Sequence, residues 1–290
     1  MTDRVRLYEV GPRDGLQNEP KPIPTADKIA LIDALSSCGF DRIEAASFVS
    51  PRAVPQMADG AEVMAGIRRA EGVRYAALTP NLKGYARAKA AGVDEAAIFA
   101  AATEGFSRAN LNASLAEATE RFRPVAEAAR ADGVPLRGYV SCVVACPYDG
   151  PTPPEAVARA VETLLEMGCY EISLGDTIGA GEPATVVPML YAALGVAPPE
   201  KLAGHFHDTG GRAMANIEAA MERGLRSFDT AAGGLGGCPF APGAPGNADS
   251  GAVAARLAQL GVETGIDLAR LSEAAALALS LRGEAADGEG

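Results

Sequence analysis

The chain has 290 residues, of which 48% are hydrophobic and 5% aromatic, and its formal net charge is −11. A chain of this length and composition can bury a substantial core, which excludes a disordered protein. Phosphate backbones and anionic lipid surfaces would repel so acidic a chain, and no basic run offsets the charge. We therefore expect neither nucleic-acid nor membrane partners.

Cysteine usage indicates the compartment. The chain has five cysteines, an odd number scattered along its length: Cys38, Cys142, Cys146, Cys169 and Cys238. Such usage is no disulfide framework and favours a reducing environment. We see no signal or transit segment and no apolar stretch long enough to span a membrane, so we expect a cytoplasmic protein. We expect a single catalytic domain over residues 1–282 and a short acidic tail over residues 283–290.

Strand-like and helix-like segments alternate along the chain. Strands are predicted at residues 5–11, 42–48, 73–79, 95–100, 136–144, 171–177, 202–208 and 226–232. Amphipathic segments rich in Ala and Leu lie between them, which implies parallel strands joined by crossover helices. Eight such units, with no Gly-x-Gly-x-x-Gly motif after the first strand, favour a closed (β/α)8 TIM barrel over a doubly wound sheet. Two last helices, at 253–260 and 268–281, are expected to close or cover the barrel.

Polar residues gather where the predicted strands end. They are Arg13 and Asp14 after the first strand, Glu44 in the second, Tyr139 in the fifth, Ser173 and Asp176 in the sixth, His205 and His207 in the seventh, and Cys238 and Asn247 after the eighth. In this fold active sites form at the carboxyl ends of the strands. Charged residues inside apolar strands cost several kcal/mol unless they are paired. The pattern therefore predicts an active site at this end of the barrel.

The two histidines of the chain, His205 and His207, are two residues apart in an apolar strand. Side chains alternate across a strand, so both imidazoles point to the same side. Two neutral imidazoles side by side form half of a divalent-metal site, and a hydrogen-bonded pair of core histidines is the alternative. Asp14 and Asn247 add a carboxylate and an amide oxygen. This mixed donor set suits Mg²⁺ or Mn²⁺, with zinc, cobalt and nickel as alternatives.

Two further residues indicate the chemistry. Arg13 puts a fixed positive charge beside Asp14, which suits stabilisation of an enolate or alkoxide. Glu44 is expected to hold Arg13 in place, or alternatively to form a plain buried ion pair with it. Cys238 lies in a loop so rich in Gly and Pro that no regular element is expected there. A thiol on such a loop could donate a proton or act as a nucleophile, and an inert small hydrophobe is the alternative.

Several runs resemble the 3-hydroxy-3-methylglutaryl-CoA lyase family. They are VGPRDGLQNE at 10–19, SFVSP at 47–51, PQM at 55–57, LTPNLKG at 78–84, RGYVSC at 137–142, GCYEISLGDT at 168–177 and GLGGCP at 234–239. The resemblance extends from Val5 to the last helix. Arg13-Asp14, Glu44 and the two histidines also mark a wider superfamily of metal-dependent barrels that includes isopropylmalate and homocitrate synthases. The loop with Cys238 resembles the lyases in particular.

The resemblance implies cleavage of 3-hydroxy-3-methylglutaryl-CoA to acetyl-CoA and acetoacetate with Mg²⁺ or Mn²⁺. It implies a metal site of Asp14, His205, His207 and Asn247. By the same resemblance, Asp14 or His205 removes the proton of the 3-hydroxyl, Arg13 stabilises the enolate, and Cys238 or a water protonates the carbanion. Glu44 and the predicted substrate-binding residues Tyr139, Ser173 and Asp176 would orient this site. We also expect a homodimer or higher homo-oligomer, and a place in leucine degradation or ketone-body formation.

Two positions depart from the family pattern. Gly251 stands where the family typically has Glu, four residues after the metal-binding Asn, and Gly210 stands where it tends to have an aromatic residue. Three alternatives stay open. The first is a lyase for a related, bulkier 3-hydroxyacyl-CoA. The second is an acyl-CoA condensing synthase, although those usually carry further C-terminal sequence. The third is a metal-binding barrel without chemistry.

Overall fold

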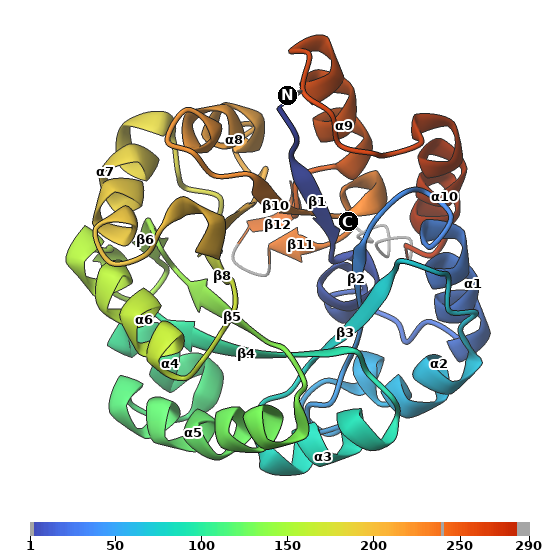
Figure 1. Cartoon of the computed structure of the whole chain (residues 1–290), viewed down its shortest axis with the longest axis horizontal. Helices are drawn as coiled ribbons and strands as arrows, with labels where there is room; N and C mark the ends of the chain where they lie inside the picture. The colour runs from blue at the N-terminus through green and yellow to red at the C-terminus, as the bar shows by residue number, and fades with distance from the viewer. Residues whose placement is uncertain (1–2, 239–240, 283–290) are drawn as a thin grey trace, which may run out of the picture.

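The computed structural model describes residues 3–238 and 241–282, with the backbone alone described at 237–238 and 241–245. Eight parallel strands close into a barrel (Figure 1). The strands are β1 (Arg6–Glu9), β2 (Arg42–Ser47), β3 (Arg74–Leu78), β4 (Glu95–Ala101), β5 (Leu136–Ser141), β8 (Ile172–Asp176), β9 (Leu202–Phe206) and β10 (Ser227–Thr230). Each overlaps one predicted strand, so the expected (β/α)8 barrel is confirmed.

The strands follow one another around the barrel in chain order, and the last pairs with the first. The register of β1 against β10 runs from Arg6 opposite Ser227 to Glu9 opposite Thr230. Because all strands are parallel, their carboxyl ends meet at one end of the barrel. The residues that follow them, separated widely in sequence, therefore lie around a common centre.

Ten helices of the described residues surround the strands (Figure 1). They are α1 (Thr25–Leu35), α2 (Gly60–Gly66), α3 (Leu82–Ala90), α4 (Glu104–Leu111), α5 (Leu115–Asp132), α6 (Pro154–Glu166), α7 (Pro183–Leu194), α8 (Ala213–Met221), α9 (Ser250–Gln259) and α10 (Leu268–Ser280). Local chemistry sets their ends: a capping box of Ser114 and Glu117 starts α5, and Gly133 ends it at φ 68°. Helices α9 and α10 close the ring between α8 and α1 (Figure 1).

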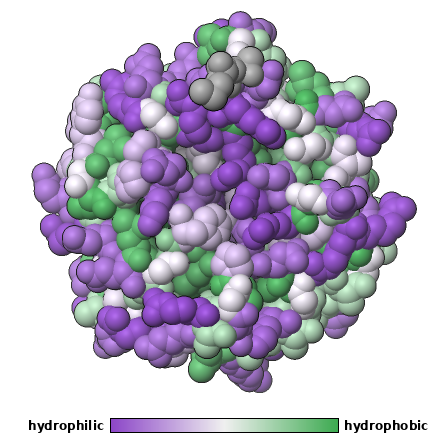
Figure 2. Space-filling model, in the orientation of Figure 1, coloured by the Kyte–Doolittle hydropathy of each residue, from purple (hydrophilic) through white to green (hydrophobic). Residues whose placement is uncertain are grey.

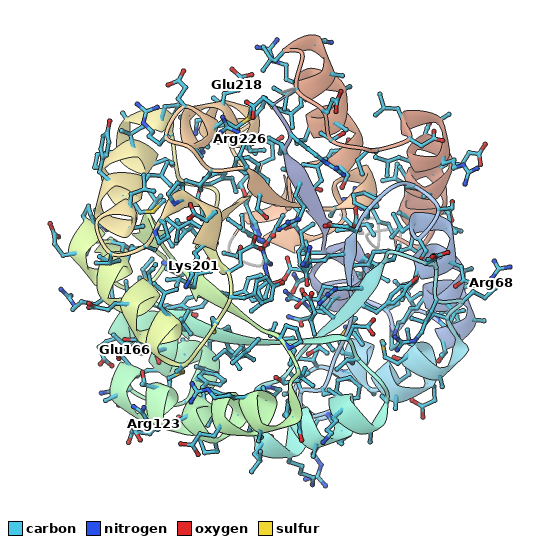
Figure 3. All side chains as sticks on the ribbon, viewed as in Figure 1. Arg68, Arg123, Glu166, Lys201, Glu218 and Arg226 are labelled. Atoms are coloured by element: carbon cyan, nitrogen blue, oxygen red, sulfur yellow. The ribbon has the colours of Figure 1, made fainter. Side chains whose placement is uncertain are left out.

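The interior of the barrel is charged at its centre. Arg137, Glu171 and Asp229 are buried there and form a continuous ion-pair network. Burial of these charges is tolerated because each has a partner of opposite sign. Figure 2 views the end where the strands begin, and the middle of that face is hydrophilic. Figure 3 places Lys201, which precedes β9, inside the ring of helices, whereas Arg68 and Arg123 project from its outer edge.

The chain departs from the predicted elements at two connections. The residues after β1 form a single π-helical turn, η1 (Gly11–Gly15). The Gly-rich segment after β10 contains a 3-10 turn, η4 (Ala232–Gly234), and an antiparallel ribbon of β11 (Gly237–Cys238) and β12 (Ala241–Pro245). The expectation of an irregular loop at Cys238 was therefore wrong. So short a ribbon needs few ladder hydrogen bonds, and edge positions tolerate Pro.

A second ribbon joins β6 (Ala145–Cys146) and β7 (Gly150–Pro151) after β5. In the part of the chain that the structure describes, no helix is long and apolar enough to cross a membrane. The predicted tail at 283–290 lies outside the described residues.

Candidate active site

A cavity of about 590 Å³ opens at the carboxyl ends of the strands. Its polar lining includes five of the predicted site residues, namely Arg13, Asp14, Tyr139, His205 and His207. Leu78, Phe99 and Phe106 add an apolar wall to the lining. Arg13 and Asp14 lie in the turn after β1, Tyr139 lies in β5, and the histidines lie at and just after the end of β9, so closure of the barrel is what brings them together.

The two imidazoles face each other at the end of β9. Their Nε2 atoms are 3.1 Å apart, and the nearest carboxylate oxygen of Asp14 lies 3.9 Å from Nε2 of His205. One ligand atom from each of the three residues lies within 4.8 Å of the others. Three donors from separate elements thus converge on one point, as a bound cation requires.

The protonation states of His207 and Asp14 suit a divalent cation. At His205 the hydrogen bond and charge of Asp229 outweigh burial and raise the pKa, so an ion bound there would compete with a proton. Burial and the neighbouring His205 lower the pKa of His207 to about 4, so its ring is neutral at neutral pH. Burial alone would raise the pKa of Asp14, but Arg13 and the two histidines outweigh it and lower that pKa to about 2. Metal ligands must be deprotonated, and a neutral imidazole beside an ionised carboxylate meets that condition. The residues present therefore fit such an ion.

Asn247 lies next to Asp14 and His207, two of the three converging ligands. Its backbone bridges to His207, and its Nδ2 donates to Asp14 Oδ2 at 3.0 Å and to the Leu235 carbonyl at 3.1 Å. A half-turn of the amide would put the Oδ1 acceptor where Nδ2 lies. Gly236, at φ 110°, allows this approach, because a Cβ there would lie 2.8 Å from Nδ2.

Arg13 is buried and held by carboxylates on two sides. Glu44 Oε2 accepts from Arg13 Nε at 2.6 Å and lies 2.5 Å from Nη2, while Asp14 Oδ1 accepts from Nη1 at 2.6 Å. The guanidinium carbon lies 5.5 Å from the centre of the Tyr139 ring. The side chain is thus fixed beside Asp14 with its charge at the cavity, which is the arrangement that enolate stabilisation needs.

Three buried polar atoms in β2 and β5 have no hydrogen-bond partner among the described residues. They are the hydroxyls of Tyr139 and Ser47 and the second carboxylate oxygen, Oε1, of Glu44. Unpartnered buried polar groups are costly and concentrate at sites that bind ligands. Tyr139 lines the cavity, although its hydroxyl is itself buried.

Ser173 and Asp176 lie in β8 but are not part of the cavity lining. The Ser173 hydroxyl donates to Asp229 Oδ2 at 2.7 Å. The Asp176 carboxylate accepts from the backbone of Ala180 and Gly181, which shapes the connection after β8. Their assignment to substrate binding stays a prediction, and each supports residues or turns next to the site.

Asp229 and Arg137 are site residues that the sequence reasoning missed. Asp229 Oδ2 lies 3.1 Å from Nδ1 of His205, and Arg137 makes two hydrogen bonds to the same carboxylate. Burial would raise the pKa of Asp229, but Arg137 and His205 hold it well below its usual range. The available signal was the occurrence of Asp and Arg inside apolar strands, at positions that face the barrel interior.

The predicted proton donor Cys238 is placed by its backbone in β11, while its side chain is outside the described residues. Cys142 follows β5 at φ 61° and is fully buried, and burial raises the pKa of its thiol. A buried thiol of this kind behaves as a small apolar group rather than as a nucleophile.

Fold and site together define a (β/α)8 barrel with a candidate divalent-metal centre at the carboxyl ends of its strands. Within that class the chain belongs to the HMGL-like family, whose model matches residues 4–278. This confirms the resemblance on which the sequence reasoning depended.

Relatives of similar length share about half of the sequence. The chain is 55% identical over 271 residues to the 3-hydroxy-3-isohexenylglutaryl-CoA/hydroxy-methylglutaryl-CoA lyase of Pseudomonas aeruginosa, covering 93% of this chain and 90% of that protein. It is 50% identical to the hydroxymethylglutaryl-CoA lyase of Pseudomonas mevalonii over 269 residues, covering 93% and 89%.

Solved structures of HMG-CoA lyases also resemble this chain closely. The HMG-CoA lyase of Brucella melitensis superposes with a TM-score of 0.96 at 60% identity, covering 97% of this chain and 99% of that chain. An HMG-CoA lyase of Acinetobacter baumannii, solved in complex with coenzyme A and 3-methylmalate, has a TM-score of 0.92 at 40% identity, covering 97% and 92%. The carboxyl transferase domain of Rhizobium etli pyruvate carboxylase, at 18% identity and a TM-score of 0.73, shares the fold alone.

Proposed function

We propose that this chain is a 3-hydroxy-3-methylglutaryl-CoA lyase, which cleaves its substrate to acetyl-CoA and acetoacetate. The observation that carries the proposal is the convergence of Arg13, Asp14 and the two histidines on one cavity of about 590 Å³. The family and the relatives named as HMG-CoA lyases support it, as does the coenzyme A bound in the A. baumannii structure.

The proposed reaction begins at the 3-hydroxyl of the substrate. Asp14, His205, His207 and Asn247 would hold a divalent cation, which when bound would lower the pKa of that hydroxyl. Asp14 or His205 accepts the hydroxyl proton. The bond between C2 and C3 then breaks, C3 becomes the ketone of acetoacetate, and the bonding electrons pass to the thioester as an enolate.

The enolate is met by Arg13. Its charge is fixed in the cavity before the reaction by Glu44 and Asp14, so no reorganisation is needed as negative charge develops on the thioester oxygen. A proton from Cys238, or from a water that it positions, then reaches C2 and completes acetyl-CoA. We propose Mg²⁺ or Mn²⁺ as the ion, because two of the four proposed ligands, Asp14 and Asn247, are oxygen donors. We also propose that the protein is located in the cytoplasm.

A direct assay tests this function. The purified protein, with Mg²⁺ and a thiol reductant, is given 3-hydroxy-3-methylglutaryl-CoA, and acetoacetate and acetyl-CoA are measured. We expect both products in equal amounts, loss of turnover on chelation and recovery when metal is restored. His207→Ala should lose metal and turnover with an unchanged circular dichroism spectrum. No acetoacetate from folded, metal-loaded protein, or full activity after exhaustive chelation, would overturn the proposal.

A second candidate substrate is 3-hydroxy-3-isohexenylglutaryl-CoA, which appears in the name of the P. aeruginosa relative. The apolar wall of Leu78, Phe99 and Phe106 favours it, because a longer branch on C3 would need such a surface. The test compares kcat/KM for both substrates in the wild type and in Leu78→Phe, which narrows the cavity. Selective loss of the longer substrate supports this candidate, and no turnover of it by the wild type rejects it.

A further inference from the structure

We propose that Asp229 is a positioning residue that fixes the ring of His205 with Nε2 free to face the cavity. The residue lies in β10, one strand away from the histidine, and does not line the cavity. Its consequence for turnover rests on the proposed function, but the orientation and tautomer of the ring can be measured without any substrate.

The contacts of the Asp229 carboxylate dictate the tautomer. Oδ2 lies 3.1 Å from His205 Nδ1 and accepts from Ser173 at 2.7 Å, while Arg137 Nη2 donates to Oδ1 at 2.7 Å. A carboxylate paired with a guanidinium is ionised and can only accept hydrogen bonds. The hydrogen between Asp229 and His205 therefore belongs to Nδ1. In the neutral ring this leaves the lone pair on Nε2, which faces His207 Nε2 at 3.1 Å.

The carboxylate has little freedom to turn away. Arg137 is fully buried, its Nε donates to Glu171 Oε2 at 2.9 Å, and its guanidinium carbon lies 4.1 Å from the centre of the Tyr8 ring. Glu171 is held in turn by Arg6 at 3.3 Å, near the end where the strands begin. A chain of alternating charges thus crosses the barrel and ends on His205. Carboxylates that orient metal-binding histidines in this way typically change metal affinity by 10–100-fold when they are removed.

His207 provides a contrast within the same site. Its Nδ1 atom is buried and has no hydrogen-bond partner among the described residues. Among the residues that the structure describes, therefore, no carboxylate holds Nδ1 of His207, whereas Asp229 holds that of His205. Since the chain has two histidines in all, a sample labelled with ¹⁵N-histidine reports on this site alone.

The variants are Asp229→Asn and, as a matched control, Glu171→Gln. Both replace a buried carboxylate of Arg137 with an amide, but only Asp229 touches His205. Long-range ¹H–¹⁵N spectra of the metal-free protein, at alkaline pH where both rings are neutral, give the tautomer of each histidine. We expect the Nδ1–H form of His205 in the wild type and in Glu171→Gln, and a mixture of tautomers in Asp229→Asn.

The second measurement is Mn²⁺ binding to the metal-free protein, followed by electron paramagnetic resonance. Asp229→Asn should weaken binding by about 10–100-fold, and Glu171→Gln should leave it unchanged. An Nε2–H tautomer of His205 in the wild type overturns the proposal without any variant, so it stays testable even if Asp229→Asn does not fold. Equal effects of the two variants on tautomer and affinity also overturn it, because Asp229 would then act only through the buried network. If the wild type fails to turn over 3-hydroxy-3-methylglutaryl-CoA but both readouts behave as expected, the proposed function fails and this inference stands.

Discussion

The charge of Arg13 is balanced by two carboxylates, yet its guanidinium still faces the cavity. Its two carboxylate partners make its burial tolerable, and the same contacts hold its guanidinium at the cavity. In the proposed reaction this fixed charge acts mainly on the transition state, because the substrate carries no enolate charge when it binds.

Arg13→Gln should therefore reduce kcat steeply while KM and metal affinity change little. Loss of one such donor costs about 3–4 kcal/mol, or about a hundred- to a thousand-fold in rate. Steady-state kinetics and Mn²⁺ titration of the variant check this. A variant that kept its kcat but lost affinity for the substrate would make Arg13 a binding residue instead.

The same substitution leaves Glu44 buried without a cation, so its effect on stability needs a separate control. The double variant Arg13→Gln/Glu44→Gln removes both charges. We expect it to recover most of the free energy of unfolding that the single variant loses, without recovering turnover. Recovery of turnover would show that the single variant was inactive because it was misfolded.

At the scale of single residues, the sequence predicts those site residues that lie close to one another along the chain. Asp14 beside Arg13, and the two histidines two apart in a strand, can be recognised without knowing the fold. The role of Asp229 cannot, because it depends on contacts with His205 and with Arg137, which are 24 and 92 residues away. Only the closed barrel brings those groups together.

Glu9 connects elements that are far apart in sequence. From the end of β1, its buried carboxylate accepts from the backbone of Gly11 at 2.9 Å and of Ala232 at 3.0 Å, and from the Ser250 hydroxyl at 2.8 Å. One side chain thus joins η1, which carries Arg13 and Asp14, to η4 and to the start of α9. Burial raises its pKa to about 7, despite these three hydrogen bonds.

This shift predicts a pH-dependent stability. A raised folded-state pKa means that the native protein binds the proton more tightly than the unfolded chain between pH of about 4.5 and 7. The free energy of unfolding should therefore fall as pH rises through that window, by at most about 3 kcal/mol. Glu9→Gln should lack this component, so its stability relative to the wild type should rise with pH in urea titrations. The exposed Glu62→Gln controls for net charge, and parallel curves for all three proteins would contradict the prediction.

The proposed role of Cys238, in the ribbon formed by β11 and β12, can be tested by chemical labelling and by substitution. As a proton donor over the cavity, Cys238 should react with alkylating reagents in the absence of substrate, and substrate should slow the reaction. Cys238→Ala should lose most of its turnover and still bind Mn²⁺. Cys142, fully buried after β5, should be labelled little in the native protein and serves as the internal control. Fast turnover by Cys238→Ala would assign proton donation to water or to His205.

The elements themselves were predictable to different degrees. The eight barrel strands are short runs that contain apolar residues and are bounded by turn residues, and each was predicted. The two-residue strands β6, β7 and β11 were not, because two residues carry no periodicity. The π-helical turn η1 was missed because a single turn with two Gly and a Pro looks like a loop in the sequence.

On the scale of the whole molecule, the net negative charge of the chain would repel the proposed substrate, which is also negatively charged. Coenzyme A carries several phosphate charges, and the chain has a net charge of −11. Among the described residues that line the cavity, the Lys and Arg side chains are those of Arg13 and Arg121. Arg13 is already paired, whereas Arg121, exposed on α5, donates to the carbonyl of Leu111 at 3.0 Å. Arg121 is therefore the cation best placed to meet a phosphate.

Arg121→Gln should lower kcat/KM for the coenzyme A substrate on the order of tenfold, as expected for one charge-assisted hydrogen bond at an exposed position. It should leave the corresponding pantetheine thioester, which lacks the nucleotide phosphates, unaffected. The control is Arg123→Gln on the same helix, since Arg123 pairs with Glu120 and lies at the outer edge of the ring (Figure 3). Equal losses with both substrates would exclude a phosphate contact.

Closure of the barrel by its first and last strands also sets the order in which the molecule can mature. Asp14 follows β1, the histidines lie at and just after the end of β9, and Asn247 follows β10, so no local piece of the chain contains all four proposed metal ligands. If these residues hold the proposed ion, a nascent chain cannot capture it until more than 240 residues have left the ribosome and β10 has paired with β1. Contacts of such long sequence separation form late and slowly. Uptake of Mn²⁺ during refolding should therefore coincide with the final kinetic phase, which makes the metal a reporter of the completed ring.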